Sequence, residues 1–153
     1  MYLDSSSISK RYVREKGTQL IDGVYGKAKA GDLRLALSIW NIGEVIGVLD
    51  RYLAKRLITE KESATARSDL VSETLKLTRL DSLDLLPVTS ALLSQSWTLI
   101  AKHHIYQADA LQISSGKGAE RSMFLTADKR LLEAALHEGL NAVNVESTNR
   151  LNL

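Results

Sequence analysis

The chain has 153 residues, of which 20 are Lys or Arg and 18 are Asp or Glu; 44% are hydrophobic and none is Cys. One domain of this length buries about 70% of the surface that its unfolded chain exposes, so it needs no covalent staples. The lack of thiols excludes a disulfide framework and a cysteine metal site, and a formal net charge of +2 is too small to indicate nucleic-acid binding by itself.

Five short apolar runs predict strands, and sequence with helical spacing separates each run from the next. The runs are residues 1–3, 33–39, 83–88, 122–126 and 142–145. Strands that alternate with helices pair in parallel through right-handed crossovers. The pattern therefore predicts an α/β fold with three layers, α/β/α, around a central, mostly parallel sheet of about five strands. We expect one domain over residues 1–146 and a C-terminal tail over residues 147–153.

The helices between these strands have recognisable ends. An apolar stripe over residues 42–53 predicts one helix. Thr59 and Glu62 match a capping box that begins a second, long amphipathic helix, so the pair is expected to form a helical hairpin. Gly139 ends the last helix as a C′ glycine.

Two further features of the first of these helices are interpreted as packing. Gly43 and Gly47 are four residues apart among the apolar positions and predict a close-packed helix face, because no Lys-Ser or Lys-Thr follows as a phosphate loop requires. Trp40 and Trp97 are interpreted as core or interface anchors rather than platforms for nucleobases.

Four acidic residues lie where a strand gives way to a helix or in the first turn of a helix: Asp4, Glu44, Asp109 and Asp128. In an open parallel sheet, ligands bind in the crevice beyond the carboxyl ends of the strands. We therefore expect Asp4 and Asp128 to face a common space. Glu44 and Asp109 are expected to join them from helix starts.

Each acid also has a purely structural explanation. Asp4 and Asp128 fit N-cap positions, and the dipole of a helix start favours Asp109. Glu44 lies three residues after Asn41, as the second half of a capping box would. Capping is served equally well by Ser, Thr or Asn, so it does not explain why all four positions carry carboxylates.

Carboxylates that share one pocket need a cation or a proton. Two of them about 4 Å apart repel by roughly 4 kcal/mol at an effective dielectric constant near 20. Oxygen ligands without nearby His or Cys select a hard ion, Mg²⁺ or Mn²⁺, rather than Zn²⁺. Such an ion keeps waters that can be activated against a phosphate.

Four segments of the sequence resemble the successive motifs of the PIN domain family. They are Met1-Tyr2-Leu3-Asp4-Ser5-Ser6-Ser7-Ile8, Asn41-Ile42-Gly43-Glu44-Val45, Tyr106-Gln107-Ala108-Asp109-Ala110-Leu111 and Phe124-Leu125-Thr126-Ala127-Asp128-Lys129-Arg130-Leu131-Leu132. Their order, spacing and structural context agree, and the similarity extends from Met1 to about Val145. The size and single-domain layout resemble the ribonuclease toxins (VapC type) of type II toxin–antitoxin pairs.

The resemblance implies a metal-dependent endoribonuclease that leaves a 5′-phosphate and a 3′-hydroxyl. The family's catalytic, metal-binding acids fall on Asp4, Glu44, Asp109 and Asp128. These would hold one or two Mg²⁺ or Mn²⁺ ions, and Asp128 would matter least. Ser5 and Thr126 fall on small polar positions beside the metals. Each would fix a carboxylate rotamer or a metal-bound water, or is simply a satisfied turn hydroxyl.

Basic residues that lie within a turn or two of the acids are candidates for RNA contact, because RNA needs cations along its backbone path. We expect such contacts from Lys129, Arg130, Lys10 and Arg11, in a wider cluster that includes Arg121. The alternative for any one of them is an ordinary solvated helix face.

The resemblance further implies partners: RNA as substrate, a cognate antitoxin whose apolar helix lies in a groove of this domain, and a second copy in a homodimer. The alternative function is a catalytically silent PIN-like module that binds RNA or protein. No apolar run approaches the ~20 residues of a membrane span, and a charge at Asp4 precedes any signal-peptide core. We therefore expect a cytoplasmic protein without membrane contact.

Overall fold

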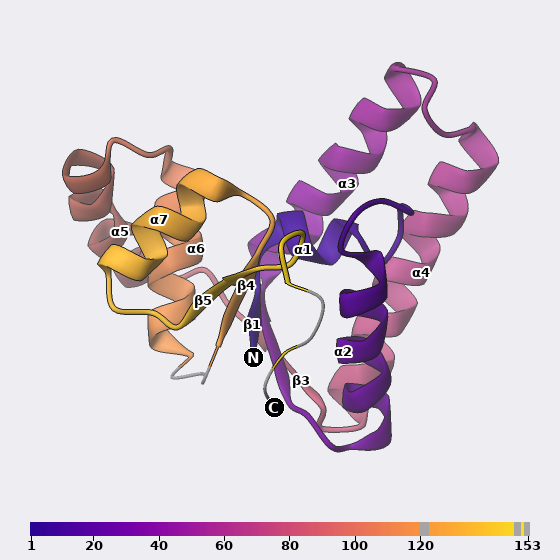
Figure 1. The fold of residues 1–153 in the computed structure, drawn as a ribbon, viewed down its shortest axis with the longest axis horizontal. Coiled ribbons are helices and arrows are strands. Elements are labelled where there is room, and N and C mark those ends of the chain that lie inside the picture. Colours follow the sequence, from indigo (N-terminus) through magenta and orange to yellow (C-terminus); the bar gives the residue numbers. More distant parts are fainter. Residues whose placement is uncertain (120–122, 149–150, 152–153) are drawn as a thin grey trace.

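The computed structural model describes residues 1–119, 123–148 and 151. Its strands are β1 (Tyr2–Leu3), β2 (Leu35–Ser38), β3 (Leu83–Leu86), β4 (Phe124–Thr126) and β5 (Ala142–Asn144). Its helices are α1 (Ser5–Ser9), α2 (Thr18–Ala30), α3 (Ile39–Ala54), α4 (Glu60–Arg79), α5 (Ser90–His103), α6 (Gln107–Gly118) and α7 (Lys129–His137). Helices and strands alternate along the chain, as the sequence predicts (Figure 1).

The strands form one parallel sheet in the order β3-β2-β1-β4-β5. Tyr2 in β1 pairs with Ala36 on one side and with Phe124 on the other, so β1 is the central strand. The chain adds β2 and β3 on one side of β1 and later places β4 and β5 on the opposite side. The direction of strand addition therefore reverses between β1 and β4, and such a switch point is where open α/β sheets bind ligands.

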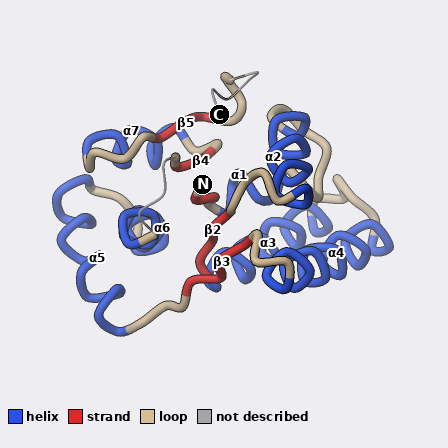
Figure 2. Tube along the Cα trace, turned by 90° about the horizontal axis from the view of Figure 1, so that it is seen from below, coloured by secondary structure: helices blue, strands red, loops and turns tan. Residues whose placement is uncertain are grey.

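Helices cover both faces of the sheet, which confirms the three-layer α/β/α fold. Helices α1 to α4 lie on one face and α5 to α7 on the other (Figure 2). Successive residues of a strand point to opposite faces, and in β1 Leu3 joins the core under α1 to α4 whereas Tyr2 joins the second core. In that second core the rings of Tyr2 and Phe124 stack with their centroids 5.3 Å apart.

The predicted helical hairpin is present as α3 and α4, which extend together beyond the sheet (Figure 1). The capping box is formed as expected: Thr59 accepts a hydrogen bond from the Glu62 backbone, and the Glu62 carboxylate accepts one from the Thr59 backbone at 2.8 Å. Gly139 follows α7 with a φ of +80°, a conformation that favours glycine. The hairpin and these two helix ends follow the sequence prediction closely.

Other boundaries differ from the prediction. The strand expected over residues 33–39 ends at Ser38, because that side chain caps α3 and forms a capping box with Asn41. Pairing Asn41 with Glu44 as the capping box was therefore wrong by one turn. The strand expected over residues 83–88 ends before Pro87, which has no backbone N–H to donate to a sheet.

Parts of two predictions fall outside the described residues. They are position 122 of the fourth strand and positions 149–150 and 152–153 of the tail. Among the helices that the structure describes, none combines the length and apolar character needed to cross a membrane.

Candidate active site

Asp4 and the last motif meet at the switch point of the sheet. Asp4 directly follows β1, and its backbone N–H donates to the Leu125 carbonyl of β4 at 3.1 Å. Thr126 ends β4, and its hydroxyl accepts from the backbone N–H of Asp128 at 3.0 Å. The two strand ends are therefore joined, which places the first and last acids at the same edge of the sheet.

The Asp4 carboxylate is buried and held in one orientation. Only 2% of the residue is exposed. One oxygen accepts from the backbone N–H of Ser7 at 2.9 Å, as an N-cap does, and the other accepts from Thr126 Oγ1 at 3.0 Å. Burial raises the pKa of Asp4 to about 6, although these hydrogen bonds favour its charged form. The site therefore holds a carboxylate that is well positioned but poorly solvated.

Ser6 is a contact of Asp4 that the sequence analysis missed. Its hydroxyl lies 2.9 and 2.8 Å from the two carboxylate oxygens of Asp4 and accepts from the backbone N–H of Ala127 at 2.8 Å. Ser5, which was expected beside the metals, interacts with the carboxylate of Glu44 rather than Asp4 and favours the charged form of Glu44. Which serine of the triplet Ser5-Ser6-Ser7 faces the acid depends on the phase of α1.

Glu44 is positioned by a buried polar network that links β1, α3 and α6. Gln112 Nε2 donates to the Glu44 carboxylate at 2.6 Å. The Gln112 side-chain oxygen in turn accepts from Asn41 Nδ2 at 2.9 Å and from the Tyr2 hydroxyl at 2.7 Å. Tyr2, Asn41 and Gln112 are all buried. The rotamer of Glu44 thus depends on residues from both helical layers.

The charges of the remaining acids are coupled. Burial raises the pKa of Glu44, and the negative charge of Asp109 raises it further. Asp109 lies in the first turn of α6, where burial and then the charge of Asp128 raise its pKa. Asp128 is exposed and caps α7, with one carboxylate oxygen accepting from the backbone N–H groups of Arg130 at 2.7 Å and Leu131 at 2.9 Å. Asp109 is therefore the electrostatic link between Glu44 and Asp128.

The oxygen atoms of the four acids suit a hard cation as ligands. Within residues 1–119, 123–148 and 151, no Lys, Arg or His forms an ion pair with any of the four acids. All of these candidate ligand atoms are carboxylate oxygens, which Mg²⁺ and Mn²⁺ prefer. In the same residues, however, no three acidic or imidazole groups are close enough together to form a ready metal site. The expectation that all four acids converge is therefore not met by a ready-made cage. Asp4 and Asp128 follow β1 and β4, and Glu44 and Asp109 lie near the starts of α3 and α6; these four are called the row of acids below.

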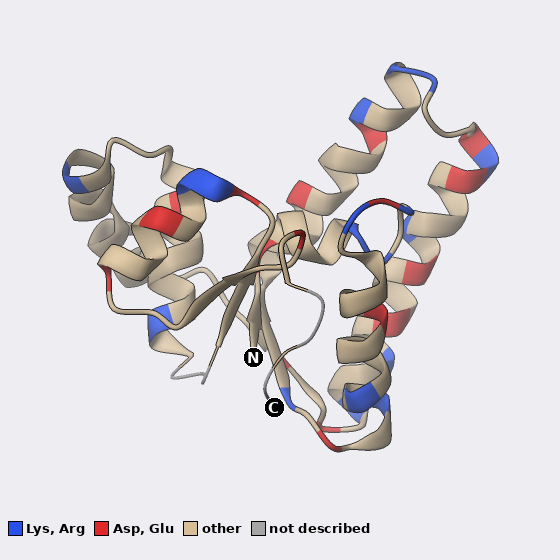
Figure 3. Ribbon diagram, in the orientation of Figure 1, with Lys and Arg blue, Asp and Glu red and all other residues tan. Residues whose placement is uncertain are grey.

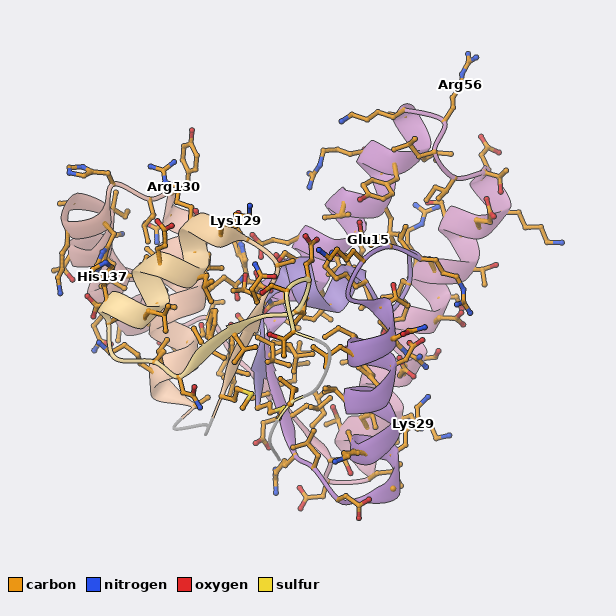
Figure 4. The ribbon with its side chains drawn as sticks, viewed as in Figure 1. Glu15, Lys29, Arg56, Lys129, Arg130 and His137 are labelled. Atoms are coloured by element: carbon orange, nitrogen blue, oxygen red, sulfur yellow. The ribbon has the colours of Figure 1, made fainter. Side chains whose placement is uncertain are left out.

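Two of the four basic residues expected to contact RNA lie beside this row. Lys129 and Arg130 are exposed at the start of α7 (Figure 4), next to Asp128. Basic residues mark this end of the helix (Figure 3). The Arg130 guanidinium donates to the His104 carbonyl, and its charge lowers the pKa of Asp109.

The other two are engaged within the protein. Lys10 is only 2% exposed, and its Nζ lies 2.6 Å from Glu146 and 3.3 Å from Glu15. The Arg11 guanidinium contacts both oxygens of Glu73 at 3.0 Å. The expectation that Lys10 and Arg11 contact RNA is therefore wrong, because internal carboxylates already neutralise their charges. Arg121 lies outside the described residues.

Comparison with known proteins agrees with the fold. The family model described as PIN domain matches residues 1–136, and no curated protein matches the chain. The chain is similar in structure to PAE2754 from Pyrobaculum aerophilum, with a TM-score of 0.64 and 18% identity over 95% of this chain and 83% of that one. It is also similar to FitAcB from Neisseria gonorrhoeae, with a TM-score of 0.64 and 17% identity over 94% of this chain and 96% of that one. At such identities the two likenesses show the fold alone.

Proposed function

The chain belongs to the PIN domain family, whose members are generally nucleases, and on that premise we propose that it is a metal-dependent endoribonuclease. The observation that carries the proposal is the buried Asp4 carboxylate, which has no cationic partner among the described residues and lies at the switch point of the sheet. A charge buried in this way costs free energy, and a bound cation offsets that cost.

The chain's own residues divide into ligands and supports. Asp4, Glu44 and Asp109 would hold Mg²⁺ or Mn²⁺, with Asp128 completing the set. When bound, such an ion supplies charge neutralisation at the phosphate and an activated water for in-line attack. Thr126 and Ser6 hold Asp4 in its rotamer, and Gln112 holds Glu44. Partners of this kind orient metal ligands.

Substrate binding is assigned to the start of α7. Lys129 and Arg130 are exposed there beside Asp128, so they can contact phosphates of an RNA strand that passes the row of acids. Contacts to phosphate fix the position of the strand without selecting a sequence.

We also propose that this nuclease is a cytoplasmic toxin of a toxin–antitoxin pair and forms a homodimer. Support comes from the resemblance in size and layout to VapC-type toxins. On α4, Val71 and Leu75 are one turn apart and exposed. Such a pair suits the apolar face of an antitoxin helix.

The nuclease activity is tested with end-labelled structured RNA. We expect cleavage in Mg²⁺ or Mn²⁺ that stops on addition of a chelator, with 5′-phosphate and 3′-hydroxyl ends on the products. Asp4→Asn should reduce the rate by at least ~100-fold, the scale of removing one electrostatic stabiliser from an active site. Asp50→Asn, at an exposed position of α3, is the matched control and should cut normally. Cutting that resists the chelator, or that survives Asp4→Asn, would overturn the proposal.

A silent binding module is the second candidate, because no three acids gather in the described part of the chain. The same assay separates the two functions. RNA that is bound but never cut, with either ion, would identify the silent module.

A further inference from the structure

A groove runs along α3 and includes one of the four acids, Glu44. Its volume is about 680 Å³, within the ~300–1,000 Å³ of pockets that hold small organic ligands. Residues 40, 43, 44, 47, 48 and 51 line it, and their spacing places them on one face of the helix. Ser5 and Glu44 line the groove and also belong to the candidate active site. A ligand in the groove would therefore touch the catalytic edge.

Trp40 is the aromatic wall of this groove. The residue is 46% exposed, so of the core or interface anchor that the sequence predicted, the core role is wrong. Its indole interacts with the carboxylate of Glu44, one helical turn away, and favours the charged form of that group. Because the polar edge of the indole is engaged, its π surface is the part that remains for a ligand.

Gly43 and Gly47 keep the groove open. A Cβ atom at Gly43 would meet nothing within 4 Å, and one at Gly47 would meet only Arg51 Nη1, at 3.5 Å. The predicted close-packed helix face is therefore wrong, since no described element packs against these glycines. Their missing side chains instead leave space beside the indole of Trp40.

Arg51 adds a positive charge to the groove. Its side chain is exposed and forms no ion pair with any described residue. A segment of single-stranded nucleic acid presents both a planar base, which stacks on an aromatic ring, and phosphates, which pair with Arg. A second copy of this chain would have to bury the charges of Glu44 and Arg51, at a cost in desolvation.

Resting on the proposed function, we propose that this groove is a subsite for one unpaired nucleobase of the RNA substrate. The base stacks on Trp40, and Arg51 contacts a neighbouring phosphate. Because Glu44 is shared between the groove and the acids, the stacked base belongs to a nucleotide beside the phosphodiester that is cut. The enzyme would accordingly require an unpaired nucleotide at that position.

The test measures binding of a fluorescent single-stranded RNA dodecamer by anisotropy at fixed salt, in the Asp4→Asn background so that the RNA stays intact. Adding Trp40→Ala should weaken binding by roughly 5- to 150-fold, the range for losing one stacked base. Trp40→Phe should retain most of the affinity. Trp97→Ala removes the other Trp, which is 58% exposed on α5 and outside the groove, and should change nothing.

Two further measurements distinguish loss of base stacking on Trp40 from an indirect effect of the substitution on Glu44. Gly47→Leu fills the groove without altering Trp40 and should cause a similar loss of affinity. An RNA with one abasic residue, moved along the dodecamer, should bind less tightly at one position. That penalty should disappear in Trp40→Ala, because paired groups give non-additive effects.

The outcomes distinguish this subsite from the proposed function. If RNA is bound and cut but Trp40→Ala binds it as well as the parent does, the subsite is overturned and the nuclease remains. If no variant binds or cuts RNA, both proposals fail. If Trp40→Ala or Gly47→Leu dissociates a dimer in sedimentation while RNA affinity is unchanged, the groove is an interface between two copies and the subsite is rejected.

Discussion

Asp4 is a residue at which stability and function oppose each other. Burial raises its pKa to about 6, against about 3.9 in an unfolded chain. The folded state therefore holds the proton more tightly than the unfolded state does. The resulting penalty on folding is complete above pH ~6 and disappears as the pH falls toward ~4. A shift of about two units corresponds to about 3 kcal/mol.

We predict that Asp4→Asn stabilises the protein at pH 8 by about 1 to 3 kcal/mol in the presence of a chelator, and leaves its stability unchanged near pH 4. Asn has the same shape, and its oxygen can still accept from the backbone of Ser7. Urea unfolding at the two pH values measures the difference, with Asp50→Asn as the exposed control. A wild-type protein that is as stable as Asp4→Asn at pH 8 would contradict the pKa assigned to Asp4.

Gln112 connects the stability of the core to the position of Glu44. We predict that Gln112→Leu lowers the free energy of unfolding by about 1 to 3 kcal/mol, because Asn41 and Tyr2 lose a buried acceptor. Freed from its donor, Glu44 should bind Mn²⁺ about 10- to 100-fold more weakly. Urea unfolding and calorimetric titration with Mn²⁺ measure the two effects. Gln95→Leu, at an exposed position of α5, is the control, and equal Mn²⁺ affinity in the two variants would reject the positioning role.

For single residues, the sequence predicts where a side chain lies in the fold better than it predicts which side chain it contacts. Asp4 and Thr126 were placed correctly at the sheet edge, because strand ends and helix starts are local features. Gln112 was missed because its partner Glu44 is 68 positions away; a lone Gln among the buried residues of α6 was the only signal. Lys10 was misjudged because its partner Glu146 is 136 positions away.

At the scale of elements, Asp128 at the start of α7 allows the capping role of an acid to be tested separately from a catalytic role. Asp128 caps α7 through one carboxylate oxygen, and we expect the other oxygen to be a ligand for a cation. We predict that Asp128→Ala destabilises the protein by about 1 kcal/mol, whereas Asp128→Asn, which keeps a capping oxygen, does not. Both variants should cut RNA more slowly than wild type but faster than Asp4→Asn. Urea unfolding and the cleavage assay test the pair, and wild-type cutting by Asp128→Asn would leave capping as the only role of this residue.

Element boundaries show why local rules succeed or fail. The capping box of Thr59 and Glu62 was predicted correctly because these residues lie in an exposed turn, where no second capping motif overlaps theirs. At the start of α3, the motif Ser38-x-x-Asn41 competed with Asn41-x-x-Glu44, and the buried Ser38 is the one that caps the helix. The strand ended one residue earlier as a result. Glu44 was thereby left facing the site rather than serving as a cap.

At the scale of the whole molecule, the order β3-β2-β1-β4-β5 determines which residues meet. Alternation of strands and helices predicts a parallel sheet, but it does not specify the strand order. Placing β4 beside β1 joins positions more than a hundred residues apart, as in the hydrogen bond from Thr126 to Asp4. The three-layer fold could thus be predicted from periodicity and the four acids from strand ends and helix starts, whereas their role in a nuclease depended on the PIN resemblance.

This arrangement makes metal binding and folding interdependent. Asp4 follows the central strand, Glu44 comes from α3 in one helical layer, and Asp109 comes from α6 in the other. An ion held by all three connects the layers and has no comparable site in the unfolded chain. We predict that Mn²⁺ at a hundredfold excess over its Kd stabilises the protein by ~2.7 kcal/mol. Urea unfolding with and without Mn²⁺ measures this gain, which Asp4→Asn should largely abolish and Asp50→Asn should retain. An equal gain in Asp4→Asn would place the ion elsewhere on the molecule, and no gain in wild type would contradict the metal site itself.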